Sequence, residues 1–241
     1  MDVRMTAVLA AAFAAWAAAV PAWAAQGEHA LNARQRAIIP IAAFTASGDM
    51  DRLAPALHEG LDAGLTVNEV KEILVQMYAY AGFPRSLNGI HAFMAVLDER
   101  KGKGIRDEEG AQASPLSTGT DRGAYGARVR AMLAGQDVIS PPQGYQLFAP
   151  VIDTFLKEHL FADIFSRDNL DHQSRELATV AALAAMSGTE GQLLFHLGAA
   201  LNTGLDDGQL QDFVRVLGDK VGETEAGNAG TVLAVVLAQR K

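Results

Sequence analysis

The chain has 241 residues, of which 49% are hydrophobic and 20% are charged, and its formal net charge is −8. This acidic balance argues against general nucleic-acid binding, which needs a basic face to displace counterions from phosphates. The sequence contains no cysteine, which excludes disulfides, cysteine-ligated zinc, iron–sulfur clusters and thiol catalysis. Alanine is abundant and aromatic residues make up only 7%, a composition that favours helices over sheets.

The first residues predict an export signal. They carry Arg4, run without charge from Met5 to Val20, and then place small residues, ending at Ala24, where a signal peptidase cleaves. An uncleaved membrane anchor is the alternative, but the apolar run is shorter than the ~20 residues that a spanning helix needs. We therefore expect residues 1–24 to be a signal peptide and the product to be periplasmic or secreted, without a membrane partner.

Helical patterns begin directly after this segment. Residues 31–46 are apolar at helical spacing, and Asn32 with Gln35 forms a predicted capping box at their start. Asp49 is placed to cap a second helix, and Gly64 is a typical residue to end it.

A third helix is expected to open at Thr66, where Glu69 completes another capping box. Pro84 should break or kink this helix, with Gly82 easing the bend. Alternating β-branched runs typical of strands are missing from the sequence. The predicted fold class is therefore all-α.

An internal duplication organises the chain, because residues 47–64 are similar to residues 187–204, 140 positions later. The shift matches Leu53 with Leu193, Leu57 with Leu197, Leu61 with Leu201, Gly64 with Gly204 and Asn88 with Asn228. Upstream the offset is 139, which pairs Arg36 with Arg175. The capping pattern also recurs, with Thr189 before Gln192 and Asp206 before Gln209. Two copies indicate a duplicated domain rather than a solenoid.

The two copies are separated by a predicted linker. Residues 99–123 are charged, rich in Gly, Ser and Thr, and lack apolar periodicity. Helical apolar spacing returns over residues 148–165. We therefore divide the chain into a first domain (25–98), the linker and a second domain (124–241).

A family resemblance is carried by residues 161–205, which read FADIFSRDNLDHQSRELATVAALAAMSGTEGQLLFHLGAALNTGL. The Ser-Arg pair, Arg-Glu-Leu, Glu-x-Gln-Leu-x-x-His and Asn-x-Gly-Leu of this segment resemble the carboxymuconolactone decarboxylase family, which includes the alkyl hydroperoxidase D group. Residues 31–50 and 64–84 resemble the same family. The resemblance implies two tandem helical domains that oligomerise, commonly as trimers or hexamers of single domains. Its decarboxylase members act on a small lactone carboxylate.

Peroxidase members of that family use a Cys-x-x-Cys pair, assisted by a glutamate and a histidine. Thr189 and Gln192 stand at the matching positions of the second copy, and Asp49 and Arg52 stand there in the first. Thiol peroxidase chemistry is therefore excluded, even though a family-level peroxiredoxin label can follow from the resemblance.

The candidate catalytic residues lie in the second copy. His196 matches the family histidine, whereas the first copy has Ala56 there and its own His58 two residues later, about 200° away around a helix. Imidazole suits proton transfer near neutral pH, Gln192 lies one turn earlier, and Glu190 lies near the helix start. We predict His196, Glu190 and Gln192 as catalytic. The alternatives are a packed structural histidine and, for Glu190, a first-turn charge.

Candidate substrate-binding residues come from both copies. Arg167 and Arg175 would supply the positive charge that an acidic protein needs for an anionic substrate, or else form intersubunit ion pairs. Tyr78, Tyr80 and Arg85 flank the predicted bend and are the other candidates for substrate binding. For the two tyrosines, packing in the core is the alternative role. One hypothesis is a composite site formed between the dissimilar copies.

No cofactor or metal is predicted. The six histidines form no His-x-x-His or His-Glu-x-x-His pattern, and phosphate-loop, dinucleotide and Gly-x-Ser-x-Gly motifs are missing from the sequence.

The sequence favours an enzyme with lyase- or isomerase-type acid–base chemistry on a small organic acid or lactone. The alternative is a non-catalytic helical binding or assembly protein that retains the scaffold. A buried, occupied pocket at His196 would favour the enzyme, and a solid core there would favour the assembly protein. As the partner we expect further copies of the chain, in a trimer that resembles a hexamer of single domains, with a dimer as the alternative.

Overall fold

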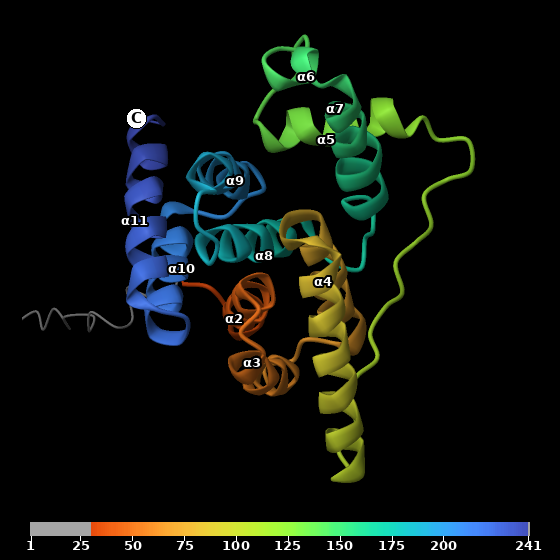
Figure 1. Cartoon of the computed structure of the whole chain (residues 1–241), viewed down its shortest axis with the longest axis vertical. Coiled ribbons are helices and arrows are strands. Elements are labelled where there is room, and N and C mark those ends of the chain that lie inside the picture. Colours follow the sequence, from red (N-terminus) through yellow and green to blue (C-terminus); the bar gives the residue numbers. More distant parts are fainter. Residues whose placement is uncertain (1–29, 241) are drawn as a thin grey trace, which may run out of the picture.

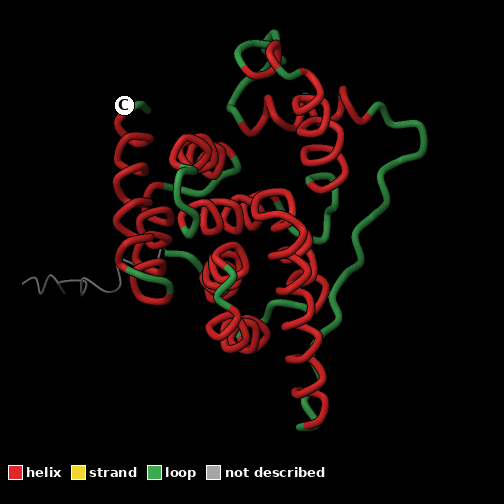
Figure 2. The backbone as a smooth tube through the Cα atoms, viewed as in Figure 1, coloured by secondary structure: helices red, strands yellow, loops and turns green. Residues whose placement is uncertain are grey.

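The computed structural model describes residues 30–240, and this part of the chain is all-α, with helices joined by loops (Figure 2). The first copy consists of α2 (Ala33–Ser47), α3 (Met50–Asp62) and α4 (Val67–Gly102). The second consists of α8 (His172–Ala184), α9 (Glu190–Asn202), α10 (Asp207–Lys220) and α11 (Glu223–Ala238). Between them, a connecting arm (residues 122–164) contains α5 (Arg122–Leu133), α6 (Tyr145–Phe148), α7 (Pro150–Phe155) and the π-helix η1 (Leu156–Ile164).

The predicted signal peptide, residues 1–24, lies outside the described residues. Within residues 30–240, no helix combines the length and the apolar character that a membrane span requires.

Local capping chemistry sets most of the helix starts. Asn32 caps α2 and Thr66 caps α4, each in a complete capping box, as predicted. The predicted cap at Thr189 is wrong, because its hydroxyl lies 2.7 and 3.1 Å from the carbonyl oxygens of Leu183 and Met186. This hydroxyl therefore holds the turn between α8 and α9 instead of the first turn of α9.

The break predicted in the third helix is confirmed at Gly82. Its φ of 83° and ψ of 161° divide α4 into two helical segments. A positive φ is accessible to glycine at little cost, and Pro84 follows as a residue that cannot continue the helical hydrogen bonding. In the second copy the same break falls at Gly222, between α10 and α11.

The linker is shorter than predicted, since α4 continues to Gly102 and α5 begins at Arg122. It runs along the outside of the molecule from α4 to α5 (Figure 1). The carbonyl oxygens of Glu108 and Glu109 accept hydrogen bonds from the backbone N–H groups of Val67 and Asn68, at 2.9 and 3.0 Å. The linker therefore satisfies donors at the start of α4 that the helix itself leaves unpaired.

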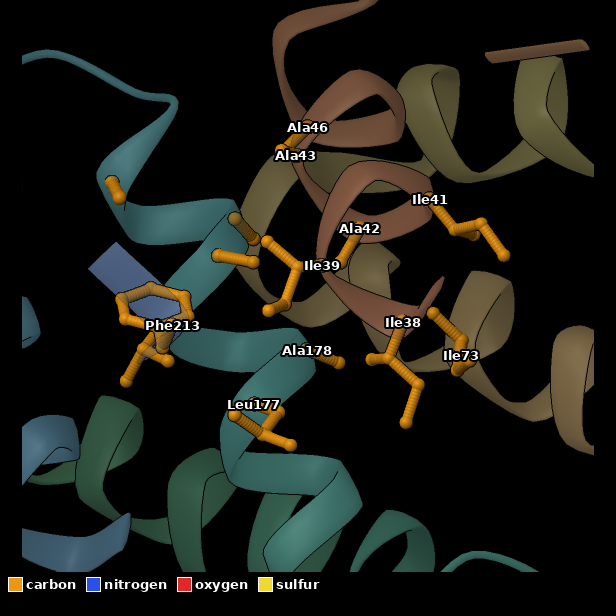
Figure 3. Packing of buried hydrophobic residues seen from close by; sticks show 14 of the residues in the cluster. Ile38, Ile39, Ile41, Ala42, Ala43, Ala46, Ile73, Leu177, Ala178 and Phe213 are labelled. Carbon is orange, nitrogen blue, oxygen red and sulfur yellow. The ribbon is translucent and has the colours of Figure 1, made fainter. Parts of the chain in front are cut away.

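The two copies share one hydrophobic core, centred on α2 and α8 (Figures 1 and 3). Ile38 and Ile39 of α2 and Leu177 and Ala178 of α8 are buried in this cluster (Figure 3). In addition, α4 of the first copy packs on α8, and α10 of the second packs on α2. Each copy thus completes the core of the other, as expected for a duplicated unit with pseudo-twofold symmetry.

The close packing of α5 on η1 depends on Gly126. A Cβ atom at this position would lie 1.8 Å from the backbone carbonyl oxygen of Lys157. We expect Gly126→Ala to lower the free energy of unfolding by about 1–3 kcal/mol, the usual cost of overpacking. Urea unfolding checks this against Gly227→Ala, a matched helical site with open space around it. Equal stability of the two variants would contradict the prediction.

Candidate active site

The centre of the site is a hydrogen-bonded pair of buried side chains, His196 on α9 and Glu176 on α8. Nδ1 of His196 lies 2.8 Å from Oε2 of Glu176, and the two residues are 6% and 0% exposed. An ionised carboxylate only accepts hydrogen bonds, so it fixes the proton on Nδ1 and leaves Nε2 for a ligand.

Glu176 was not among the residues predicted for the site, although it lies next to Arg175 in the Arg-Glu-Leu match. A comparison of the two copies could have pointed to Glu176. The first copy has Ala37 at the position of Glu176 and Ala56 at the position of His196. Both members of the polar pair are therefore replaced by alanine together, which indicates that they act together.

Tyr80 of the first copy contacts this pair of the second copy. Its ring centroid lies 5.5 Å from that of His196, edge-on at 79°, and its hydroxyl is buried without a hydrogen bond of good geometry. Burial raises the pKa of Tyr80 and the nearby Glu176 charge adds to this effect, so the side chain is a neutral phenol. The geometry therefore places residues of both copies at one site, as the composite-site hypothesis requires.

A pocket of about 840 Å³ opens beside His196. Its polar lining residues are Tyr80, Arg130, Tyr145, Thr189, Gln192 and His196. The rest of the lining is apolar or glycine: Ala79, Ile152, Leu156, Leu160, Phe161, Leu183, Gly188, Gly191 and Phe195. A large, mainly apolar pocket with a few convergent polar groups is the usual form of a small-molecule site.

One wall of the pocket is the π-helix η1, which contributes Leu156, Leu160 and Phe161. The prediction that residues 148–165 are helical is confirmed, but the π conformation of η1 was not predicted. Over a segment this short, apolar spacing does not distinguish a wider helical turn from an ordinary one. Local π-turns occur frequently at functional sites.

Of the three predicted catalytic residues, the fold places two at the pocket and one outside it. His196 and Gln192 both line the pocket. Glu190 is exposed in the first turn of α9 and is not among the lining residues. Its position fits a first-turn charge that interacts favourably with the helix dipole.

The predicted arginine clamps are engaged elsewhere. Arg175 is fully buried, and its Nη2 and Nη1 donate to Oε1 of Glu72 and Oε1 of Gln76, each at 2.9 Å. Arg167 donates from Nε to the same Glu72 carboxylate at 2.9 Å. Neither arginine lines the pocket at His196, so the geometry gives no support to a substrate-clamp role. The ion pairs join the two copies within one chain.

The same ion pair recurs at the equivalent place in the other half. Arg36, which corresponds to Arg175, bonds Asp212, which corresponds to Glu72, at 2.7 Å. The Arg36 side chain is 41% exposed, whereas that of Arg175 is 0% exposed. The duplication therefore supplies a solvated and a buried version of one interaction.

Of the remaining predicted residues, Tyr78 lies near the pocket and Arg85 does not. The Tyr78 ring stacks on Phe83 with centroids 4.5 Å apart and lines a smaller apolar cavity beside the main one. Arg85 is exposed, and its guanidinium lies against the backbone of Gly48 at the turn between α2 and α3.

Asp153 holds the connecting arm beside the pocket. This buried carboxylate accepts from Nη1 of Arg130 at 2.6 Å, from Nε2 of Gln146 at 2.7 Å, and pairs with Nζ of Lys157 at 2.8 Å. Burial alone would raise the pKa of Asp153, but the hydrogen bonds from Lys157, Gln146 and Arg130 lower it to about 2. The carboxylate is thus strongly stabilised in its ionised form.

These contacts predict a specific loss of stability in acid. Because the folded-state pKa of Asp153 lies below its ordinary value of 3.8, its contribution is present above that value and is lost as the pH falls toward 2. We expect wild type to exceed Asp153→Asn in unfolding free energy at pH 6, and this difference to shrink at pH 2.5. Urea unfolding at both pH values measures it, and a constant difference would contradict the assignment.

Comparison with known proteins is consistent with this architecture. The model of the carboxymuconolactone decarboxylase family matches residues 10–95, which include α2, α3 and most of α4, and residues 150–229, which include α7, η1 and α8 to α10. No curated protein matches the chain significantly. Within residues 30–240, no three histidine, aspartate or glutamate side chains gather as a metal site would require. The family match covers more than half of the chain, and the cysteine-free protein therefore belongs to the carboxymuconolactone decarboxylase family, with two tandem helical domains.

Proposed function

We propose that this protein is an enzyme that performs lyase- or isomerase-type acid–base chemistry on an organic acid or lactone. The observation that carries the proposal is the 2.8 Å contact between His196 and Glu176 beside an open pocket of about 840 Å³. A pocket rather than a solid core at His196 supports a small-molecule site over a purely structural assembly role, and turnover distinguishes the enzyme from a non-catalytic binding protein.

The roles of the pair follow from its geometry. Glu176 orients the imidazole through its contact with Nδ1, and Nε2 exchanges a proton with substrate. In a decarboxylation, the bond between carbon and carboxylate breaks, carbon dioxide leaves, and the electron pair enters an enolate conjugated with the carbonyl. Protonated Nε2 then gives its proton to carbon, and solvent restores that proton. Gln192, which lines the pocket, is a neutral donor suited to the enolate oxygen.

An isomerisation uses the same groups without loss of carbon dioxide. Neutral Nε2 removes a proton from the carbon next to the carbonyl and returns it to the conjugated carbon. Neither reaction needs a thiol, which agrees with the cysteine-free sequence.

Deuterium incorporation tests the proposal directly. The protein is incubated in D₂O with a panel of lactones, lactone carboxylates and β,γ-unsaturated acids, and the products are followed by NMR. Decarboxylation takes its proton from solvent and places deuterium in the product, whereas an isomerisation that returns the same proton is detected as conversion of the substrate. The proposal fails if the protein neither incorporates deuterium into any compound of the panel nor converts one above the rate of a protein-free control.

We also propose that the protein is exported to the periplasm or secreted, and that its chains assemble into a homo-oligomer. The connecting arm presents large apolar side chains to solvent, of which Phe148 is 92% exposed and Leu147 is 67% exposed. Contiguous exposed apolar surface is typical of protein interfaces, which supports a homo-oligomer, with a trimer as the expected form. Light scattering on the purified protein tests this proposal, and the mass of a single chain would refute it.

A further inference from the structure

The walls of the pocket at His196 are mainly hydrocarbon. Ile152 of α7, Leu156, Leu160 and Phe161 of η1 and Leu183 of α8 face the cavity. Its volume of about 840 Å³ lies in the upper part of the range of roughly 300–1,000 Å³ that small-molecule sites occupy. A compact polar molecule would leave much of this apolar surface uncovered.

The apolar region continues beyond the main pocket. A second cavity of about 310 Å³ shares Ala79, Ile152, Leu156 and Leu160 with it, and adds Tyr78, Phe155 and His159. His196 does not line this second cavity. The shared residues form a wall common to both cavities, so apolar surface along α7 and η1 borders the polar end at His196.

The pocket has no uncompensated positive charge among its lining residues. Arg130 is the cation in the lining, and it bonds the buried carboxylate of Asp153 at 2.6 Å. Lys157 pairs with the same carboxylate, and His196 pairs with Glu176. A ligand with several carboxylates would lose its hydration here without gaining counterions, which is costly.

From these observations we propose a substrate class for the site: a neutral or singly charged lactone or organic acid that carries an extended apolar portion. Its reactive carbonyl end lies at His196, Gln192 and Thr189, and its hydrocarbon portion lies along Leu156 toward the second cavity. This inference rests on the proposed function, since it specifies the substrate of the same site. It excludes compact polycarboxylates as the preferred ligands.

The first experiment measures how affinity depends on chain length. The purified protein is titrated by calorimetry with γ-butyrolactone, γ-octalactone and γ-dodecalactone, and with citrate as a compact polycarboxylate. Each buried methylene is expected to tighten binding by about fourfold, until the cavity is filled. Citrate is expected to bind more weakly than γ-dodecalactone. Affinity that does not change with chain length, or citrate as the tightest ligand, would overturn the inference.

A pair of variants locates the binding surface. Leu156→Gln should weaken γ-dodecalactone binding at least tenfold and should weaken γ-butyrolactone binding much less. Leu87→Gln, on an exposed position of α4 outside both cavities, is the matched control and should change neither. Circular dichroism verifies folding, and Ile152→Gln, at a more exposed lining position, repeats the test if Leu156→Gln does not fold. Unchanged binding of γ-dodecalactone to the folded variant would refute the assigned surface.

The result separates this inference from the proposed function. Chain-length-dependent binding without deuterium incorporation or substrate conversion would retain the ligand class and refute the catalytic role. Deuterium incorporation into compact polycarboxylates, with no dependence on chain length, would retain the catalytic role and refute the ligand class.

Discussion

Replacing His196 with asparagine is expected to lower turnover by about 10²- to 10⁴-fold, the usual contribution of general acid–base catalysis. The asparagine amide can still donate to Glu176, so the buried carboxylate keeps a partner while the titratable nitrogen is lost. Turnover of a substrate from the deuterium screen is compared between variant and wild type, together with helical content.

The duplicated sequence offers a matched control for this variant. His58 lies on α3, which corresponds to α9, but it is not among the residues of the pocket at His196. We expect His58→Asn to retain full turnover. Full turnover by His196→Asn would refute the proton-transfer role, whereas equal losses in both variants would indicate a general effect on the fold.

Replacing Glu72 with alanine is expected to lower the free energy of unfolding by about 3–5 kcal/mol, as found when one partner of a buried ion pair is removed. The guanidinium of Arg175 would then remain fully buried without its carboxylate, and Arg167 would lose the same partner. Urea unfolding monitored by circular dichroism measures the loss.

The equivalent pair in the other half provides the comparison. Asp212→Ala removes the acceptor of Arg36, Arg215 and the Leu31 N–H, but solvent already reaches both arginine side chains and keeps them hydrated. The cost should therefore be smaller than that of Glu72→Ala. Replacing Glu72 and Arg175 together with leucine and methionine should recover much of the loss, because no charge is then left buried. A Glu72→Ala variant no less stable than Asp212→Ala would contradict this explanation.

Features that depend on neighbouring residues were predictable from the sequence. The capping boxes at Asn32 and Thr66 and the break at Gly82 are confirmed, because short-range sterics and hydrogen bonds determine them. The duplication was also visible, since matched leucines and glycines keep their spacing across the copies. The all-α class follows from these signals together.

Features that depend on contacts between copies were not predictable in the same way. Arg175 was expected to meet a substrate, because the sequence did not show that Glu72, more than a hundred positions earlier, lies beside it. The sequence favours neither core packing nor the site for Tyr80 decisively, because its position against His196 depends on the packing of α4 near α8. Glu176 acts through a partner on another helix, and the sequence reflects that partnership only indirectly, in the paired Ala37 and Ala56 of the first copy.

Helices of each copy pack against the other copy, and this packing constrains the order in which the chain folds. The backbone N–H of Leu31 bonds a carboxylate oxygen of Asp212, 181 positions away, and Nη1 of Arg52 bonds the carbonyl oxygen of Val221. Contacts between such distant residues form late, because the intervening chain must first close into a large loop at an entropic cost. The first copy therefore leaves the ribosome with its apolar face uncovered, and its tertiary structure is completed only after α8 and α10 have been synthesised.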